Sequence, residues 1–190
     1  MTDSFSYVSV LTSIVLALCI ARVFAGVGKL LQLRGRVRIC WIHLLWALNL
    51  FLYLVLNWWI LYRWRGEEHW TFFLFLFVLL SPSLTYLLSV LLFPDPLEAG
   101  TDLKGHFFSN HRRFFSLAML VPLLDAADTY LKGWEHFLAQ GPIYFVTIGL
   151  LFVLMAVAAL SRRVWFHAFF AVFFLVYLLA FITINLRVLT

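Results

Sequence analysis

The amino-acid sequence predicts an all-α integral membrane protein, folded as a bundle of six transmembrane helices in a single domain. Of its 190 residues, 64% are hydrophobic and 12% are charged, and so few charges do not cover the surface of a water-soluble domain of this length. Inside a bilayer every backbone N–H and C=O group needs a partner within the protein, which leaves helices or closed β-barrels. The apolar runs are continuous over roughly 18–25 residues and do not alternate, so they favour helices.

Short polar connections divide the chain into six apolar runs. No basic residue precedes the first run, so we interpret it as a span and not as a cleaved signal peptide. The fourth run is the weakest span, because it contains two aspartates. The predicted spans are 7–31, 40–62, 70–93, 114–132, 143–160 and 165–187, and the longest connection is 94–113.

Basic residues alternate between the connections, and this pattern predicts the orientation. Positively charged connections stay in the cytoplasm, so we expect the first, third and fifth connections inside the cell and both termini outside. The expected location is the bacterial inner (plasma) membrane. The same bias accounts for the formal net charge of +5, so no nucleic-acid partner is expected. The first, third and fifth connections hold Arg34, Arg36, Arg38, Lys104, Arg112, Arg113, Arg162 and Arg163, whereas the second and fourth hold Arg63, Arg65 and Lys132.

The first two spans each carry a line of polar residues on one side. Polar side chains that face lipid tails stay unpaired, so both lines are expected to face other helices. Two interpretations stand: interhelical hydrogen bonds that hold the bundle together, or the wall of a polar path. At 100° per residue the lines are Thr12, Cys19, Arg22, Gly26 and Lys29 on the first span, and His43, Trp46, Asn49, Tyr53 and Asn57 on the second.

The third and fourth spans are each interrupted by a proline. Pro82 stands between Ser81 and Ser83 near the middle of the third span, and Pro122 lies in the fourth. A proline inside a helix removes one backbone donor and leaves the carbonyl four residues earlier without its partner, so we expect a kink at each. Kinked helices occur in transporters, where they expose carbonyls to an ion, and also in inert bundles.

The fourth span also holds the two aspartates. Asp125 lies twelve residues beyond Arg113, or ~18 Å along the helix axis, which places it near the middle of a core ~30 Å thick. Asp128 is four residues before Lys132, so an ion pair between these two is expected at the outer rim. For Asp125 two interpretations stand: a structural ion pair with Arg22 of the first span, or a group that takes up a proton or a cation because desolvation penalises its charged form.

The fifth and sixth spans complete the bundle, and the sixth begins with a Trp-x-His sequence that the second span also carries. His43 and His167 are therefore expected at similar depths on different helices. Two such imidazoles have the chemistry to ligate a haem iron or to hold a quinone. Histidines at this depth are more often interfacial anchors, so no cofactor and no metal site are expected.

The first functional hypothesis is a small transporter or channel for a proton or small cation. Its binding group is Asp125, with Asp128 beside it and Arg22 as the counter-charge. Pro82 and Pro122 permit gating in this hypothesis. Its polar lining consists of Asn49, Asn57, Ser81 and Ser83.

The alternative is a non-enzymatic membrane subunit or sensor. Here the polar residues only hold the bundle together, and connection 94–113 docks a cytoplasmic protein. A redox protein that uses His43 and His167 is the third hypothesis. With connections this short there is no soluble catalytic domain, so an enzyme is not expected, and the small size of the bundle favours a homo-oligomer.

Overall fold

A computed structural model describes residues 4–67 and 69–185 of the chain, and in this part the predicted six-helix membrane fold is confirmed. Six helical segments are long and apolar enough to cross a bilayer, the fourth of them being Leu103–Leu131. The last two residues of the predicted sixth span, 186 and 187, lie outside the described residues. In chain order the elements are α1 (Ser4–Gln32), α2 (Trp41–Leu61), the 3₁₀-helix η1 (Tyr62–Trp64), α3 (Phe72–Leu92), α4 (Leu103–Ala118), α5 (Leu120–Leu131), α6 (Trp134–Ala139), α7 (Gly141–Leu160) and α8 (Val164–Asn185).

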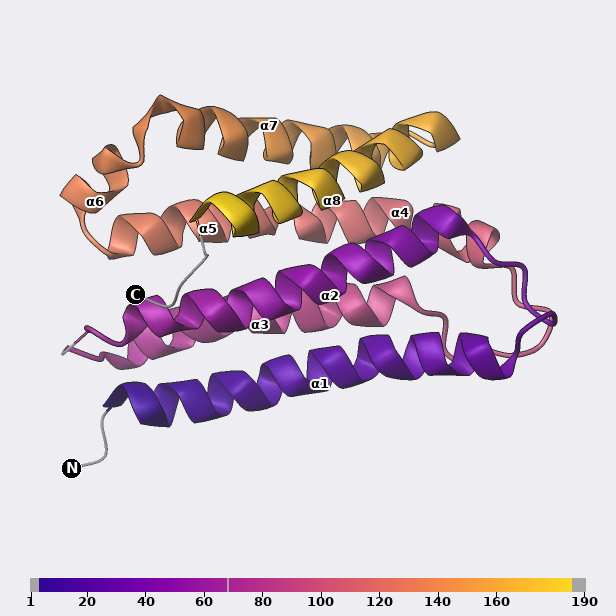
Figure 1. The fold of residues 1–190 in the computed structure, drawn as a ribbon, viewed down its shortest axis with the longest axis horizontal. Helices are drawn as coiled ribbons and strands as arrows, with labels where there is room; N and C mark the ends of the chain where they lie inside the picture. Colours follow the sequence, from indigo (N-terminus) through magenta and orange to yellow (C-terminus); the bar gives the residue numbers. More distant parts are fainter. Residues whose placement is uncertain (1–3, 68, 186–190) are drawn as a thin grey trace.

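The bundle has two distinct ends (Figure 1). At one end lie η1, α6 and the first turn of α1, and we call it the η1–α6 end. At the other lie the connections 33–40, 93–102 and 161–163, and we call it the basic end because Arg36, Arg38, Arg162 and other cations gather there. That the basic end faces the cytoplasm stays a prediction from the charge pattern.

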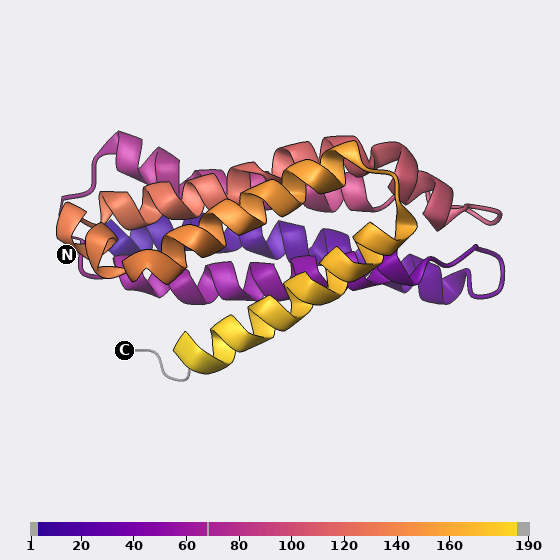
Figure 2. The ribbon, with the colours of Figure 1, turned by 90° about the horizontal axis from the view of Figure 1, so that it is seen from above.

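The helices are arranged with α1 at one edge and α7 at the opposite edge (Figure 1). Between them, α3 packs on α1, α2 and α4, while α7 packs on α4 and α5. The last helix, α8, packs mainly along α2 and only slightly on its chain neighbour α7. Both views show α7 and α8 separating toward the η1–α6 end (Figures 1 and 2).

Buried aromatic rings join α2, α4 and α8 at the centre of the bundle. Trp46 of α2 is only 4% exposed. Its ring centroid lies 5.9 Å and 5.1 Å from those of Phe114 and Phe115 of α4, and 5.2 Å and 5.6 Å from those of Phe170 and Phe174 of α8. These five residues are the aromatic core. The edge-to-face contacts of Trp46 with Phe114, Phe115 and Phe170 add to the stabilisation that burial provides.

The predicted start of the fourth span and the predicted extent of the third connection are wrong. Helix α4 begins at Leu103, whereas the sequence predicts a connection over 94–113 and a span from residue 114. Asp102 caps the helix, since its side chain accepts a hydrogen bond from the backbone N–H of Lys104. Residues on one face of α4, such as Leu103 and Phe107, are buried at a spacing of four. The charged residues on the opposite face lower the mean hydropathy of the segment, so a hydropathy profile does not detect this apolar face.

The connection that remains, 93–102, is bonded to connection 33–40. The backbone N–H of Arg38 donates to the carbonyl of Thr101 at 3.0 Å, and that of Leu103 donates to the carbonyl of Arg38 at 3.1 Å. A backbone held in this way is a poor docking loop, so the fold does not favour the hypothesis that 94–113 binds a cytoplasmic protein.

Helix α1 approaches the end of α3 closely at Gly26. A Cβ atom at this position would lie 2.5 Å from ring carbons of Phe93. Gly26→Ala is therefore expected to lower the free energy of unfolding by about 1–3 kcal/mol, because the buried Phe93 ring must move. Chemical unfolding in mixed micelles measures this loss.

Gly28→Ala is the matched control, because nothing lies within 4 Å of a Cβ atom added there. It lies on the same helix, and the higher helix propensity of alanine should leave stability unchanged or slightly raised. Equal losses in the two variants would show that the contact with Phe93 does not limit the approach of α1.

Candidate functional site: a polar cavity around Asp125

A cavity of about 870 Å³ lies inside the bundle. Side chains of α1, α2, α3, α5, α7 and α8 form its wall, and residues of η1 and the following connection, together with His136 and Gln140, surround it at the η1–α6 end. Phe174 belongs both to this wall and to the aromatic core, so the core ends the cavity toward the basic end. The cavity therefore lies in the half of the bundle toward the η1–α6 end.

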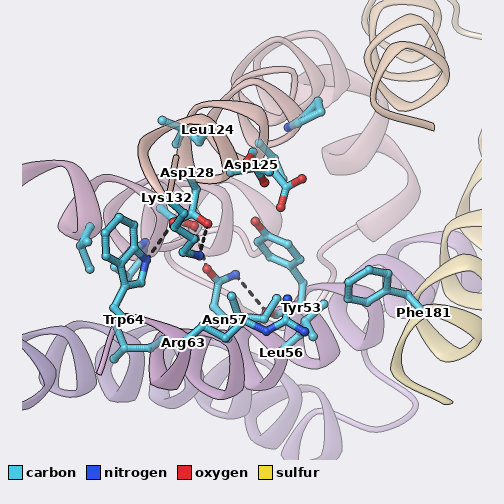
Figure 3. Close-up of a pocket in the computed structure, with 18 of the residues that line it drawn as sticks. Tyr53, Leu56, Asn57, Arg63, Trp64, Leu124, Asp125, Asp128, Lys132 and Phe181 are labelled. Atoms are coloured by element: carbon cyan, nitrogen blue, oxygen red, sulfur yellow. Dashed lines mark hydrogen bonds and ion pairs between the residues drawn. The ribbon is translucent and has the colours of Figure 1, made fainter. Parts of the chain in front are cut away.

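Asp125 of α5 presents its carboxylate to this cavity (Figure 3). The hydroxyl of Tyr144 donates to its Oδ2 atom at 3.0 Å, and Thr129 donates to its backbone carbonyl at 3.0 Å. The ring of Tyr53 points toward it from α2 (Figure 3). Within the part of the chain that the structure describes, no cation forms an ion pair with Asp125.

Asp128, one turn further along α5, is fully partnered. Its Oδ2 atom forms an ion pair with Lys132, and its Oδ1 atom accepts a hydrogen bond of 2.9 Å from the indole N–H of Trp64. The Lys132 ammonium also lies 4.9 Å from the centroid of the Trp64 ring. The pair that the i, i+4 spacing predicts is thus present, and the two charges cancel locally.

Asn57 and Ser81 also line the cavity, as the sequence predicts for a polar wall. Ser81 donates to the Oδ1 atom of Asn57 at 2.7 Å, while the amide of Asn57 donates to the carbonyl of Tyr53 at 3.1 Å. These contacts join α2 to α3 and hold both side chains in place. The two predicted kink residues, Pro82 and Pro122, belong to the same wall.

The expected ion pair between Arg22 and Asp125 is wrong. Arg22 pairs instead with Asp95 of connection 93–102, at 3.1 Å. The two predicted partners lie at different depths: Arg22 is eighteen residues from the start of α1, or ~27 Å from the η1–α6 end, whereas Asp125 is six residues from the end of α5, or ~9 Å. The early start of α4 also moves Asp125 away from the predicted midplane.

Two predicted lining residues lie outside the cavity. Asn49 is buried and donates to the carbonyl of Ala171 at 2.9 Å, so it joins α2 to α8, as the structural interpretation of the stripe predicts. Ser83 is exposed on the outer surface of α3. It follows Ser81 by two residues, or about 200° around the helix, so the two serines cannot face the same cavity.

His43 and His167 cap helix ends at the basic end. The Nε2 atom of His43 donates to the carbonyl of Leu92, the last residue of α3, at 2.7 Å, and that of His167 donates to the carbonyl of Ser161 after α7 at 2.8 Å. The last carbonyl groups of a helix have no hydrogen-bond partner within the helix. In an apolar environment a carbonyl group without a hydrogen bond is energetically costly. Both Nε2 atoms are occupied by these bonds, and each imidazole serves a different helix, so the geometry gives no support to a shared haem or quinone ligand.

The site also contains residues that the sequence does not single out. Tyr144, Thr129 and Trp64 contact the two aspartates directly, and Tyr177 lines the same cavity. One available signal is that Tyr144 and Thr147 stand three residues apart in an otherwise apolar span, on one face of the helix. Within residues 4–67 and 69–185, no three His, Cys, Asp or Glu side chains are grouped to hold a metal ion.

The fold and the cavity together define a class: a helical integral membrane protein with six spans and a polar cavity around an unpaired carboxylate. No protein-family model, no curated protein and no solved structure matches this chain. The function is therefore argued from the cavity alone.

Proposed function

We propose that the protein is a small transporter or channel that carries a proton or a small cation across the membrane, with Asp125 as the binding group. The observation that carries this proposal is the contrast between the two aspartates of α5. Asp128 forms an ion pair with Lys132, whereas Asp125 faces a large cavity and has no ion pair with a cation among the described residues. A carboxylate at this depth is costly to keep charged, so a cation or a proton that binds it gains a large stabilisation.

The route in this proposal begins at the η1–α6 end and passes Asp125 toward Asn57 and Ser81. The aromatic core closes the route toward the basic end, so passage requires these rings to move. Helix α4 ends at Ala118, the residue whose carbonyl Pro122 leaves without a donor, and α5 continues after it. This interruption gives the fourth span a point at which its two halves can change their angle.

The test is cation flux in proteoliposomes, measured for H⁺, Na⁺, K⁺ and methylammonium. Asp125→Asn is expected to reduce the flux to the leak of protein-free liposomes, because the amide is uncharged. The fold should persist, since the amide oxygen still accepts the hydrogen bond from Tyr144.

Asp95→Asn is the matched control. It makes the same chemical change in a carboxylate whose side chain is 74% exposed near the basic end, and wild-type flux is expected. A wild-type protein that carries none of the four cations, or an Asp125→Asn variant that carries them at the wild-type rate, would contradict the proposal.

A further inference from the structure

The volume of the cavity is far larger than an inorganic cation or a proton requires. At about 870 Å³ it lies within the range of sites that hold organic molecules, ~300–1,000 Å³. A bare ion with a few waters needs much less, since each water occupies ~30 Å³. The size of the cavity therefore points to an occupant with a carbon skeleton.

Three tyrosines from three different helices line the cavity together with Asp125. Tyr144 of α7 donates a hydrogen bond to the carboxylate. Tyr53 of α2 and Tyr177 of α8 line the same cavity. We call these three residues the tyrosine cage. The faces of aromatic rings attract cations, and rings around an ammonium group are a known means of binding one.

Apolar side chains form another part of the wall, so the cavity combines polar groups with a hydrophobic surface. Phe77 of α3, Phe174 and Phe181 of α8, and Leu56 and Leu124 of α2 and α5 all contribute to it. An apolar wall with a few convergent polar groups is the usual composition of a site for an organic ligand. It would bind the apolar body of a molecule whose charge lies at Asp125.

Among the described residues that line the cavity, two carboxylates have no ion pair: Asp125 inside it and Glu67 at its mouth. Asp128 and Lys132 cancel one another. At the mouth, Arg65 contacts the hydroxyl and the ring of Tyr62, and Glu67 accepts a hydrogen bond from a backbone N–H.

Two further groups that can carry positive charge line the mouth. Arg63 is exposed there, ten residues beyond Tyr53 or ~15 Å along the helix direction. His136 of α6 lines the mouth with it, also exposed. Deep in the cavity one negative charge remains, and it matches one positive charge on the ligand.

We propose that the cavity binds a lipophilic organic monocation, such as a quaternary ammonium ion, with its charge at Asp125 inside the tyrosine cage and its body against the apolar wall. This inference rests on the proposed function and extends its substrates from small cations to organic ones. It accounts for three features that proton transport alone does not require: the volume, the cage and the apolar wall.

The test is equilibrium binding of radiolabelled tetraphenylphosphonium to the full chain in lipid nanodiscs, with empty nanodiscs as the blank. Saturable binding is expected for the wild type and for Asp95→Asn. Asp125→Asn is expected to weaken binding at least tenfold. Equal binding by the wild type and Asp125→Asn would overturn the inference.

Tyr177 supplies a second pair of variants that does not depend on the carboxylate. Tyr177→Phe keeps the ring and should bind as the wild type does, whereas Tyr177→Ala should bind roughly 3- to 10-fold more weakly. If phenylalanine weakens binding as much as alanine does, the ring face is not what holds the cation, and the cage is refuted.

The two proposals fail separately. Asp125-dependent flux of H⁺, Na⁺ or K⁺ without any binding of tetraphenylphosphonium would overturn the inference and leave the transport function standing. Asp125-dependent binding without flux of any cation tested would overturn the transport function and support the site as a binding site for organic cations.

Discussion

Trp46→Ala is expected to lower the free energy of unfolding by about 3–5 kcal/mol, the range for removing a large buried aromatic side chain. Trp46 is only 4% exposed, and its ring contacts Phe115 and Phe170 among the four phenylalanines of the aromatic core. Since these partners come from α4 and α8, the cavity left by alanine would loosen three spans at once. Chemical unfolding in mixed micelles, followed by tryptophan fluorescence and circular dichroism, measures the loss.

Trp58→Ala is the control for this substitution. Trp58 lies on the same helix, α2, but is 54% exposed on the outer surface of the bundle. Its loss is expected to change the free energy of unfolding by no more than about 0.5 kcal/mol, the usual range for exposed positions. If the two variants lose similar stability, the aromatic core is not the element that holds the three spans together.

Asp128→Asn is expected to weaken the binding of tetraphenylphosphonium, although Asp128 is not the residue proposed to bind it. The substitution leaves the Lys132 ammonium without its partner, about two turns or ~10 Å beyond Asp125. One unpaired charge ~10 Å from the bound cation costs ~1.7 kcal/mol at an effective dielectric constant of ~20. This corresponds to a loss of affinity on the order of tenfold.

The double variant Asp128→Asn with Lys132→Gln tests whether charge causes this loss. It removes both members of the ion pair and so restores one uncompensated negative charge in the cavity. Binding in nanodiscs is expected to return to within about threefold of the wild type, since the remaining electrostatic difference is small. A double variant as weak as Asp128→Asn would instead mean that the pair shapes the cavity through its contact with Trp64.

The spans are the part of the fold that can be predicted well from the sequence. A bilayer of fixed thickness requires apolar segments of fixed length, and every backbone group must bond within its own helix. The number of spans follows from these local requirements, as does the ion pair of Asp128 with Lys132, which depends only on helix geometry. Asn57 and Ser81 were identifiable as wall residues because their polarity stands out in apolar segments.

The wrong predictions concern where one helix begins and how the helices lie against one another. Arg22 was offered as the partner of Asp125, but it pairs with Asp95, because α1 and α5 hold the two residues at different depths. Ser83 was placed in the lining, although it lies on the opposite face of α3 from Ser81. Such errors follow from a boundary or a rotation that hydropathy alone does not determine.

The sequence by itself determined that this chain is a six-span helical membrane protein and that α5 carries two carboxylates in it. Only the tertiary structure decided that Tyr53, Tyr144 and Tyr177 line one cavity with Asp125, and that Trp64 donates a hydrogen bond to Asp128. The physical reason lies in the solvent. Lipid is as apolar as the interior of the bundle, so helices such as α7 and α8 are apolar on nearly all sides. Their sequences therefore contain no amphipathic pattern from which the buried face could be predicted.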